Sequence, residues 1–281
     1  MAAQPTESLR PGAALFRTGD GSTALRDAEG ELFDLALPAD AADRICAALQ
    51  GKAADPEELA AFRAAGHLGA RRHWPAERRR IGLLVTGSRP VAAAMMDAVV
   101  AAGACPVELP GEVSVAGVVD RGVAAVSALH DGAAPEWWSR LDALPEHGIA
   151  WQRVSREGRH VLLEPIAAHP GDVGHVDVRA RRLAAAGSGH RHLSAYWQQS
   201  ATGRTITGEE LLDAGECRLV ASLVTHDLAT WAIGTASSHN RLSHNSFTPT
   251  PLPANRRLRV VDLDGGAIAD HPVLPVPACA E

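Results

Sequence analysis

The residues that could carry chemistry begin with a glycine turn between a buried strand and a helix. The strand is expected at Ile81–Thr86, and Gly87-Ser88-Arg89-Pro90 follows it. A strand, turn and helix in this order can bind phosphates on the N-terminal amides of the helix, and the pattern G-x-G-x-x-G lets the backbone approach them closely. Here only Gly87 remains, Arg89 occupies the second glycine position, and Pro90 removes an amide donor. The sequence therefore predicts that no cofactor binds at this turn.

Histidine and cysteine are the next residues with chemical potential, and their spacing predicts no metal site. A structural zinc ion needs four good ligands, which usually include C-x-x-C pairs. The four cysteines form no such pair: Cys46, Cys105, Cys217 and Cys279. Two close histidine pairs occur, but with 13 histidines in the chain such pairs arise by chance: His190 with His192, and His239 with His244. The chain also lacks a G-x-S-x-G nucleophile elbow, so we expect no catalytic residues.

Composition limits the possible partners. The 281 residues carry a net charge of −6, whereas general nucleic-acid binders are usually basic. Residues 1–12 lack the apolar region of a signal peptide, and no apolar run approaches the length of a membrane span. We therefore expect a cytoplasmic protein that binds neither nucleic acid nor membrane.

The periodicity of apolar residues predicts two regions. In residues 1–75, three short apolar stretches separated by turn residues indicate a three-stranded meander, and two helical patterns follow, the second starting near Pro56. Residues 70–80 form a charged linker. Residues 76–281 alternate strand and helix patterns, which is typical of an open α/β domain.

Within the second region the patterns predict particular elements. Buried strands are expected at Ile81–Thr86, Ala116–Val119 and Val123–Leu129. A helix is expected at Pro135–Leu144, and a long one from a capping box at Thr207 and Glu210 to Ile233. An antiparallel hairpin is expected from Ile149–Val154 and Val161–Ile166, and a late strand at Leu258–Leu263.

The C-terminal tail, residues 268–281, carries the most specific pattern. It contains His271-Pro-Val-Leu-Pro-Val-Pro-Ala-Cys279, in which three prolines forbid helix and favour an extended segment. This run resembles the C-terminal signature of ThiF-like proteins that accompany YcaO cyclodehydratases in azole-forming (TOMM and thiopeptide) ribosomal peptide biosynthesis. In that family a second cysteine follows; here Glu281 is reached first.

The resemblance implies a Rossmann-type ThiF-like scaffold whose usual ATP and zinc sites are degenerate. The family uses a lysine on the ATP phosphates, and the single lysine here, Lys52, lies outside the α/β region. An acidic residue should follow the second strand, and Glu108 is the nearest one. His175 and Val178 stand where the family has a C-x-x-C, so at most His175 and Cys279 remain as zinc ligands. We expect a non-catalytic subunit without ATP or zinc.

The first region resembles the precursor-peptide recognition element (RRE) of these pathways, a winged-helix-like module that precedes the ThiF-like domain. In that family a leader peptide adds as a strand to the third strand and contacts a neighbouring helix. The third strand here is Glu31–Ala36. The resemblance implies these contact residues: Leu32, Asp34, Leu35 and Ala36 from the strand, and Leu59, Phe62 and Arg63 from the helix. The simpler alternative is that Leu59 and Phe62 belong to the core of the module.

These expectations combine into one functional hypothesis. The chain binds the leader of a ribosomal precursor peptide and presents its core to a YcaO-type cyclodehydratase or another peptide-modifying enzyme, and it can pair as a homodimer. Two alternatives remain open: an ATP-dependent adenylating enzyme of the ThiF-like type, and a winged-helix DNA-binding regulator that uses the linker arginines as phosphate contacts.

Overall fold

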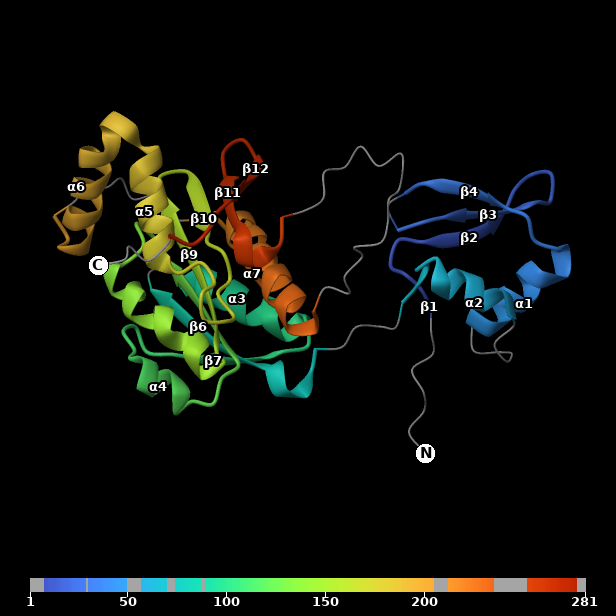
Figure 1. Ribbon diagram of the computed structural model, residues 1–281, viewed down its shortest axis with the longest axis horizontal. Helices are drawn as coiled ribbons and strands as arrows, with labels where there is room; N and C mark the ends of the chain where they lie inside the picture. Colours follow the sequence, from blue (N-terminus) through green and yellow to red (C-terminus); the bar gives the residue numbers. More distant parts are fainter. Residues whose placement is uncertain are drawn as a thin grey trace. The chain divides into compact units, whose positions relative to one another are not determined.

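The computed structural model describes residues 8–28, 30–49, 57–69, 74–86, 89–204, 212–234 and 252–276. The contacts divide the chain into two compact units, Met1–His73 and Trp74–Glu281. The division falls just before Trp74, a buried side chain that belongs to the core of the second unit. Both units are shown in Figure 1. Each is described by itself below, as unit 1 and unit 2.

Unit 1 contains the expected three-stranded antiparallel meander. Its strands are adjacent in the order in which they occur: β2 (Ala14–Arg17), β3 (Thr23–Arg26) and β4 (Leu32–Leu35). Gly21 and Gly30 adopt positive φ angles of 85° and 93° in the two turns, a conformation that suits glycine because it has no Cβ. A second, two-residue pairing was not foreseen: β1 (Ser8–Leu9) with β5 (Leu68–Gly69).

Two helices complete unit 1, α1 (Ala39–Leu49) and α2 (Glu57–Ala64). They pack apolar side chains against one face of the meander. The buried core consists of Leu25, Ile45, Ala48, Leu59 and Phe62. The positions at which apolar residues recur in the sequence therefore predict both helices correctly.

Unit 2 is built on a seven-stranded mixed sheet in the order β12-β11-β10-β9-β8-β6-β7. Four strands are parallel: β7 (Cys105–Glu108), β6 (Arg80–Thr86), β8 (Ala125–His130) and β9 (Ala150–Glu157). Antiparallel strands extend the sheet beyond β9: β10 (His160–Leu163), β11 (Arg257–Asp262) and β12 (Ile268–Pro272). The hairpin and the late strand are as expected.

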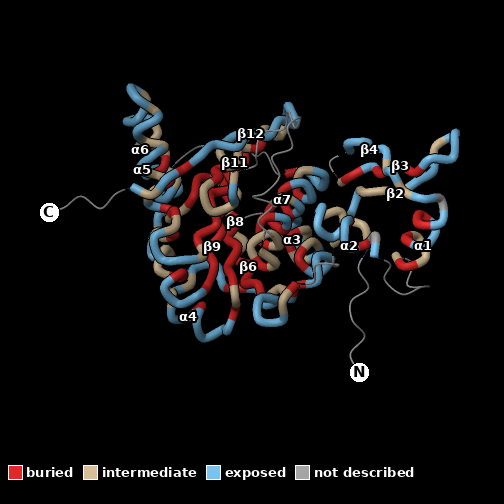
Figure 2. The backbone as a smooth tube through the Cα atoms, turned by 45° about the vertical axis from the view of Figure 1, so that its right-hand side comes forward, coloured by how far each residue is buried: buried red, intermediate tan, exposed pale blue. Residues whose placement is uncertain are grey.

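Helices cover both faces of the parallel strands, which are deeply buried (Figure 2). α3 (Arg89–Ala101) and α7 (Ala214–Ile233) pack on one face. α4 (Val115–Val119) and the 3₁₀ helix η2 (Glu136–His147) pack on the other. α5 (His175–Ala185) and α6 (His190–Ala201) follow the hairpin. Because both faces are covered, the strands are apolar nearly throughout instead of alternating.

Several predicted elements differ from the observed ones. The strand predicted at Ala116–Val119 is wrong: this segment is α4, because Ser114 caps it by accepting a hydrogen bond from the amide of Gly117 at 3.2 Å. The helix predicted at Pro135–Leu144 is a longer 3₁₀ helix. α7 begins at Ala214 with a different capping box, Asp213 with Glu216; the predicted box at Thr207 and Glu210 lies outside the described residues. Strand β7 was not predicted.

Within the described part of the chain, no helix has the length and apolar character that crossing a bilayer requires.

Candidate functional site: a free strand edge in unit 1

Strand β4 forms the outer edge of the meander in unit 1. It pairs with β3 alone, and no other described strand of the meander pairs with its second edge. Asp27 donates its backbone N–H to the carbonyl of Glu31 at 2.9 Å, which sets the hydrogen-bonding alternation along β4. The backbone groups of Leu32 and Asp34 therefore point away from β3, toward the free edge. An edge of this kind can pair with an added strand.

The side chains of β4 alternate between the two faces of the meander. Phe33 lies opposite buried Leu25, on the face that the helices cover, yet its side chain remains 45% exposed. Its ring centroid lies 6.3 Å from that of His67, which follows α2. The ring of His67 lies 6.2 Å from Phe62 in an edge-to-face arrangement. Phe33, His67 and Phe62 thus form an aromatic row from the edge strand toward the core.

The structure places the predicted contact residues in three different environments. Leu59 and Phe62 are buried, 1% and 6% exposed, so both belong to the core of unit 1. Leu35 is half-buried against the same core. The remaining residues are exposed: Leu32, Asp34, Ala36 and Arg63.

Two residues beside the free edge were missed, Phe33 and His67. The alternation of the strand could have revealed Phe33, since it shares a face with Leu35 and lies one residue from the predicted Leu32 and Asp34. His67 has no comparable sequence signal, because its contact with Phe33 depends on how α2 packs against the meander.

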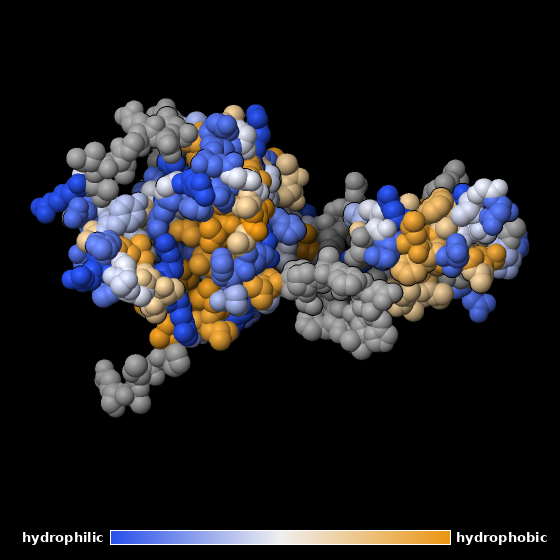
Figure 3. Space-filling model, turned by 90° about the horizontal axis from the view of Figure 1, so that it is seen from above, coloured by the Kyte–Doolittle hydropathy of each residue, from blue (hydrophilic) through white to orange (hydrophobic). Residues whose placement is uncertain are grey.

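The opposite face of the meander is also apolar. Leu32 is 67% exposed and Phe16 is 41% exposed, both on the face that the helices leave uncovered. Hydrophobic residues are visible on the surface of unit 1 in the view of Figure 3. Phe16 and Phe33 therefore offer a matched pair of half-exposed rings on opposite faces of one small sheet.

In unit 2, the region of the degenerate glycine turn lies at the C-terminal edge of the parallel strands, where open α/β sheets usually bind ligands. β6 ends at Thr86 and β8 at His130, and Thr86 Oγ1 lies 2.7 Å from His130 Nδ1. Burial lowers the pKa of His130, although the Asp131 carboxylate opposes this shift. Pro90 lies in the first turn of α3, where it supplies no amide donor. Gly87, Ser88 and the Arg89 side chain lie outside the described part.

The positions that resemble a zinc motif carry a buried hydrogen-bonded cluster instead. His175 Nδ1 lies 2.9 Å from the Glu164 carboxylate, and Arg153 Nε donates to Glu164 at 2.8 Å. Burial raises the pKa of Glu164, but His175 and Arg153 outweigh burial and lower it overall. Val178 is buried among apolar side chains. Among the described residues, no group of three or more His, Cys, Asp or Glu side chains could hold a metal.

The buried cluster has a structural role. Arg153 also donates to the carbonyls of Pro165 and Val173, at 2.6 and 3.0 Å. The Asp142 carboxylate accepts the backbone N–H groups of His175 and Val176, which begin α5. A buried arginine needs such complete pairing, because leaving one of these charges without a partner would cost about 3–5 kcal/mol. The cluster therefore fixes the start of α5 to the hairpin of β9 and β10.

No family model matches the sequence, and no curated protein matches it. Solved structures do match the fold. The heterocyclase TruD is 16% identical with a TM-score of 0.60 over 98% of this chain and 42% of its own. A heterocyclase in complex with substrate and cofactor is 14% identical with a TM-score of 0.58 over 97% of this chain and 39% of its own. The chain therefore spans about two fifths of the length of these heterocyclases.

A shorter protein matches along its whole length. It is a chain of the E. coli microcin synthetase McbBCD complex with pro-MccB17 bound, 12% identical with a TM-score of 0.51 over 97% of this chain and 98% of its own. These likenesses show that the chain has the mixed α/β, ThiF-like fold shared by heterocyclases and microcin synthetase components of ribosomal peptide biosynthesis. The resemblance inferred from the proline-rich tail is confirmed at the level of fold.

Proposed function

We propose that the chain binds the leader region of a ribosomally made precursor peptide on the free edge of β4. The bound leader would present the core of the precursor to a separate YcaO-type cyclodehydratase for azoline or azole formation. The observation that carries this proposal is the half-exposed Phe33, which lies beside His67 on an edge strand without a partner among the described strands. In this proposal residues 1–75 act as a winged-helix-like peptide-recognition module.

The physical basis is strand addition. The outward backbone groups of Leu32 and Asp34 pair with the leader, and Phe33 and Leu35 contact its alternate side chains. Arg63, exposed on the last turn of α2, gives this side of the module a positive charge. Phe62 supports the site from the core, by holding His67 beside Phe33. Leu59 contributes only to the stability of the module.

The comparisons support this proposal through what the matched proteins hold. The matched synthetase complex has pro-MccB17 bound, and one matched heterocyclase holds a substrate and a cofactor. Those are properties of the matched proteins. For this chain, a non-catalytic role follows from its own residues, since the glycine turn is degenerate and the described part contains no lysine. Its contribution would be effective concentration, because tethering the leader makes the encounter of core and enzyme intramolecular.

The test is fluorescence polarisation of a labelled leader peptide from the precursor encoded beside this protein, titrated with the full chain. We expect micromolar or tighter binding. Phe33→Asp places a charge beside the leader and should weaken binding by at least about tenfold, as expected for a central contact. Phe16→Asp is the matched control, because it adds the same charge to a similarly exposed ring on the opposite face.

A second variant addresses the backbone. Asp34→Pro removes an N–H group that points away from β3, so the meander should persist while the added strand loses a hydrogen bond. Binding should weaken with little change in thermal stability. Absence of leader binding by the full chain, with or without the neighbouring enzyme, would refute the proposal.

A further inference from the structure

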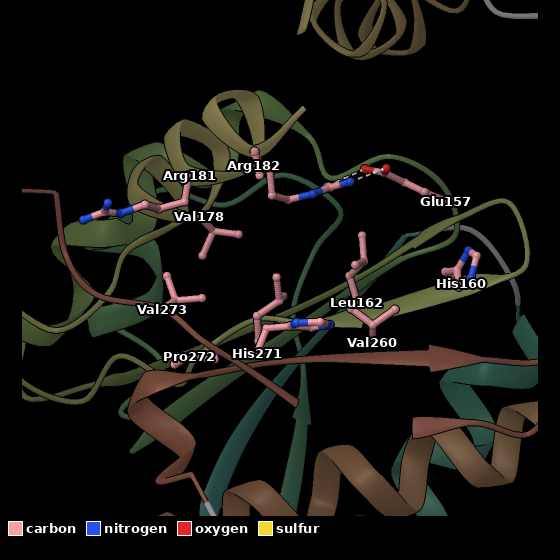
Figure 4. A pocket seen from close by; sticks show the side chains of 12 residues that line it. Glu157, His160, Leu162, Val178, Arg181, Arg182, Val260, His271, Pro272 and Val273 are labelled. Atoms are coloured by element: carbon pink, nitrogen blue, oxygen red, sulfur yellow. Dashed lines mark hydrogen bonds and ion pairs between the residues drawn. The ribbon is translucent and has the colours of Figure 1, made fainter. Parts of the chain in front are cut away.

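Unit 2 contains a surface cavity of about 490 Å³ between α5 and the antiparallel end of the sheet, far along the chain from the strand edge of unit 1. Its floor is apolar, and the side chains of Leu162, Val178, Val260 and Val273 point into it (Figure 4). The cavity exists because α5 covers the β10–β12 part of this face incompletely. We call it the α5 groove.

The segment that follows β12 forms one wall of the groove and is held in place. Arg181 of α5 donates to the carbonyls of Leu274 and Pro275, at 3.3 and 3.1 Å. Asp177 accepts the backbone N–H of Val276 at 2.8 Å. Val273 is buried and donates its N–H to the carbonyl of Arg256 at 2.8 Å. These bonds make the groove a preformed feature, and a partner that binds there does not need to order its wall.

The rim of the groove carries excess positive charge. Its acidic side chain, Glu157, is already neutralised by Arg182, whose two guanidinium nitrogens donate to the carboxylate at 2.8 and 2.7 Å. Trp197 donates a third hydrogen bond to the same carboxylate at 3.0 Å. Arg181 donates to carbonyls only, and within the described part of the chain no carboxylate pairs with it. His160 and His271 stand on the strand side of the groove (Figure 4).

An apolar floor with a cationic rim is complementary to a bulky apolar side chain flanked by carboxylates. We propose that the α5 groove is the docking site for the partner peptide-modifying enzyme, which inserts a segment of this composition. This inference rests on the proposed function, in which the enzyme is a separate chain. The lengths support that arrangement: this chain spans only 42% of TruD but 98% of a chain from a multi-component synthetase complex.

The exposed residues beside the groove extend the proposed interface. Leu274 and Val276, on the outer side of the segment that forms the wall, are 63% and 42% exposed. A stable interface buries about 1,200–2,000 Å² in total, which exceeds a cavity of this size. The groove would therefore serve as the central anchor of a larger contact, the position at which interface energy usually concentrates.

The test is calorimetric titration of the full chain with the purified peptide-modifying enzyme encoded beside it. Ala185→Trp fills the groove from the exposed end of α5 and should weaken enzyme binding at least about tenfold. Ala184→Trp, an equally bulky change at the neighbouring exposed position outside the groove, should leave binding unchanged.

The charge component is tested separately. Arg181→Gln should weaken binding and reduce its dependence on salt, whereas Arg191→Gln, the same change on exposed α6, should not. Arg181→Lys keeps the charge and should restore most of the affinity.

Leader binding, measured on the same variants, separates this inference from the proposed function. If the enzyme binds wild type and Ala185→Trp equally, or does not bind wild type at all, the docking proposal is wrong even where the leader still binds. If the leader fails to bind but enzyme binding is lost in Ala185→Trp and kept in Ala184→Trp, the groove is supported and the leader proposal fails.

Discussion

The two sheets of this protein differ in how completely they are covered. The parallel strands of unit 2 have helices on both faces, and Trp138, Leu141 and Leu144 of η2 are fully buried against them. The meander of unit 1 has helices on one face only, and Phe16, Leu32 and Phe33 remain substantially exposed. The apolar residues of unit 2 stabilise a scaffold, whereas those at the meander surface are available for contact with another molecule.

The difference extends to the strand edges. In unit 2 the outer strand β12 leads into a segment that hydrogen bonds hold against α5. In unit 1 the edge strand β4 keeps outward backbone groups at Leu32 and Asp34. A sheet that serves as scaffold has its edge occupied, and a sheet that binds peptide must keep one edge free.

The largest expected effect breaks the scaffold side of this comparison. Trp138→Ala removes a fully buried ring that contacts Trp151 and His175, and should lower the free energy of unfolding by about 3–5 kcal/mol. Phe33→Ala should cost less than about 1 kcal/mol, because the ring is already half exposed, yet should weaken leader binding. Urea unfolding of both variants measures the contrast. Equal destabilisation would show that Phe33 is a core residue.

A smaller effect concerns pH. The pKa of His130 is lowered by burial, so the folded chain favours the neutral ring. Its stabilising contribution is present above the ordinary pKa of 6.5 and is lost as the pH falls through the lowered value in the fold. The slope of unfolding free energy against pH should approach about 1.4 kcal/mol per unit in this window, since the unfolded chain alone binds the proton. His130→Gln should flatten this part of the curve; an unchanged slope would contradict the assignment.

A second step is expected at lower pH, from Glu157. Burial raises the pKa of this carboxyl, but its hydrogen bonds with Arg182 outweigh burial and lower it below the ordinary 4.5. Its contribution is therefore present above pH 4.5 and is lost as the pH falls through the folded value. Urea midpoints measured down through this range should show the loss in wild type and a smaller loss in Glu157→Gln.

The smallest expected effect is the response to nucleotide. A ligand at a hundred times its Kd stabilises a protein by about 2.7 kcal/mol, which raises Tm by several degrees. ATP with magnesium should leave the Tm unchanged, because Pro90 and the degenerate turn remove amide donors from the phosphate site. The leader peptide is the positive control in the same thermal assay. A clear rise in Tm with ATP would favour the adenylating alternative and remove the contrast between a binding unit and an inert scaffold.

Local patterns were sufficient for most of the fold. The meander, both helices of unit 1 and the hairpin of unit 2 follow from apolar spacing and turn residues, which act over a few positions. Ala116–Val119 was misassigned because a short apolar run fits a buried strand as well as a helix, and the cap at Ser114 decided between them. Phe62 was correctly placed on a helix beside the third strand, but the packing of unit 1 buries it and exposes Phe33 instead.

The sequence by itself determined the family resemblance, the order of elements and the degenerate glycine turn, because these depend on residue types at fixed spacings along the chain. Only the tertiary structure decided which side chains meet across long separations. His175 pairs with Glu164 and Arg153, Phe33 lies beside His67, and the segment after β12 binds α5 to form the groove. Such contacts join residues whose proximity is set by how sheets and helices pack, and no local pattern encodes that packing.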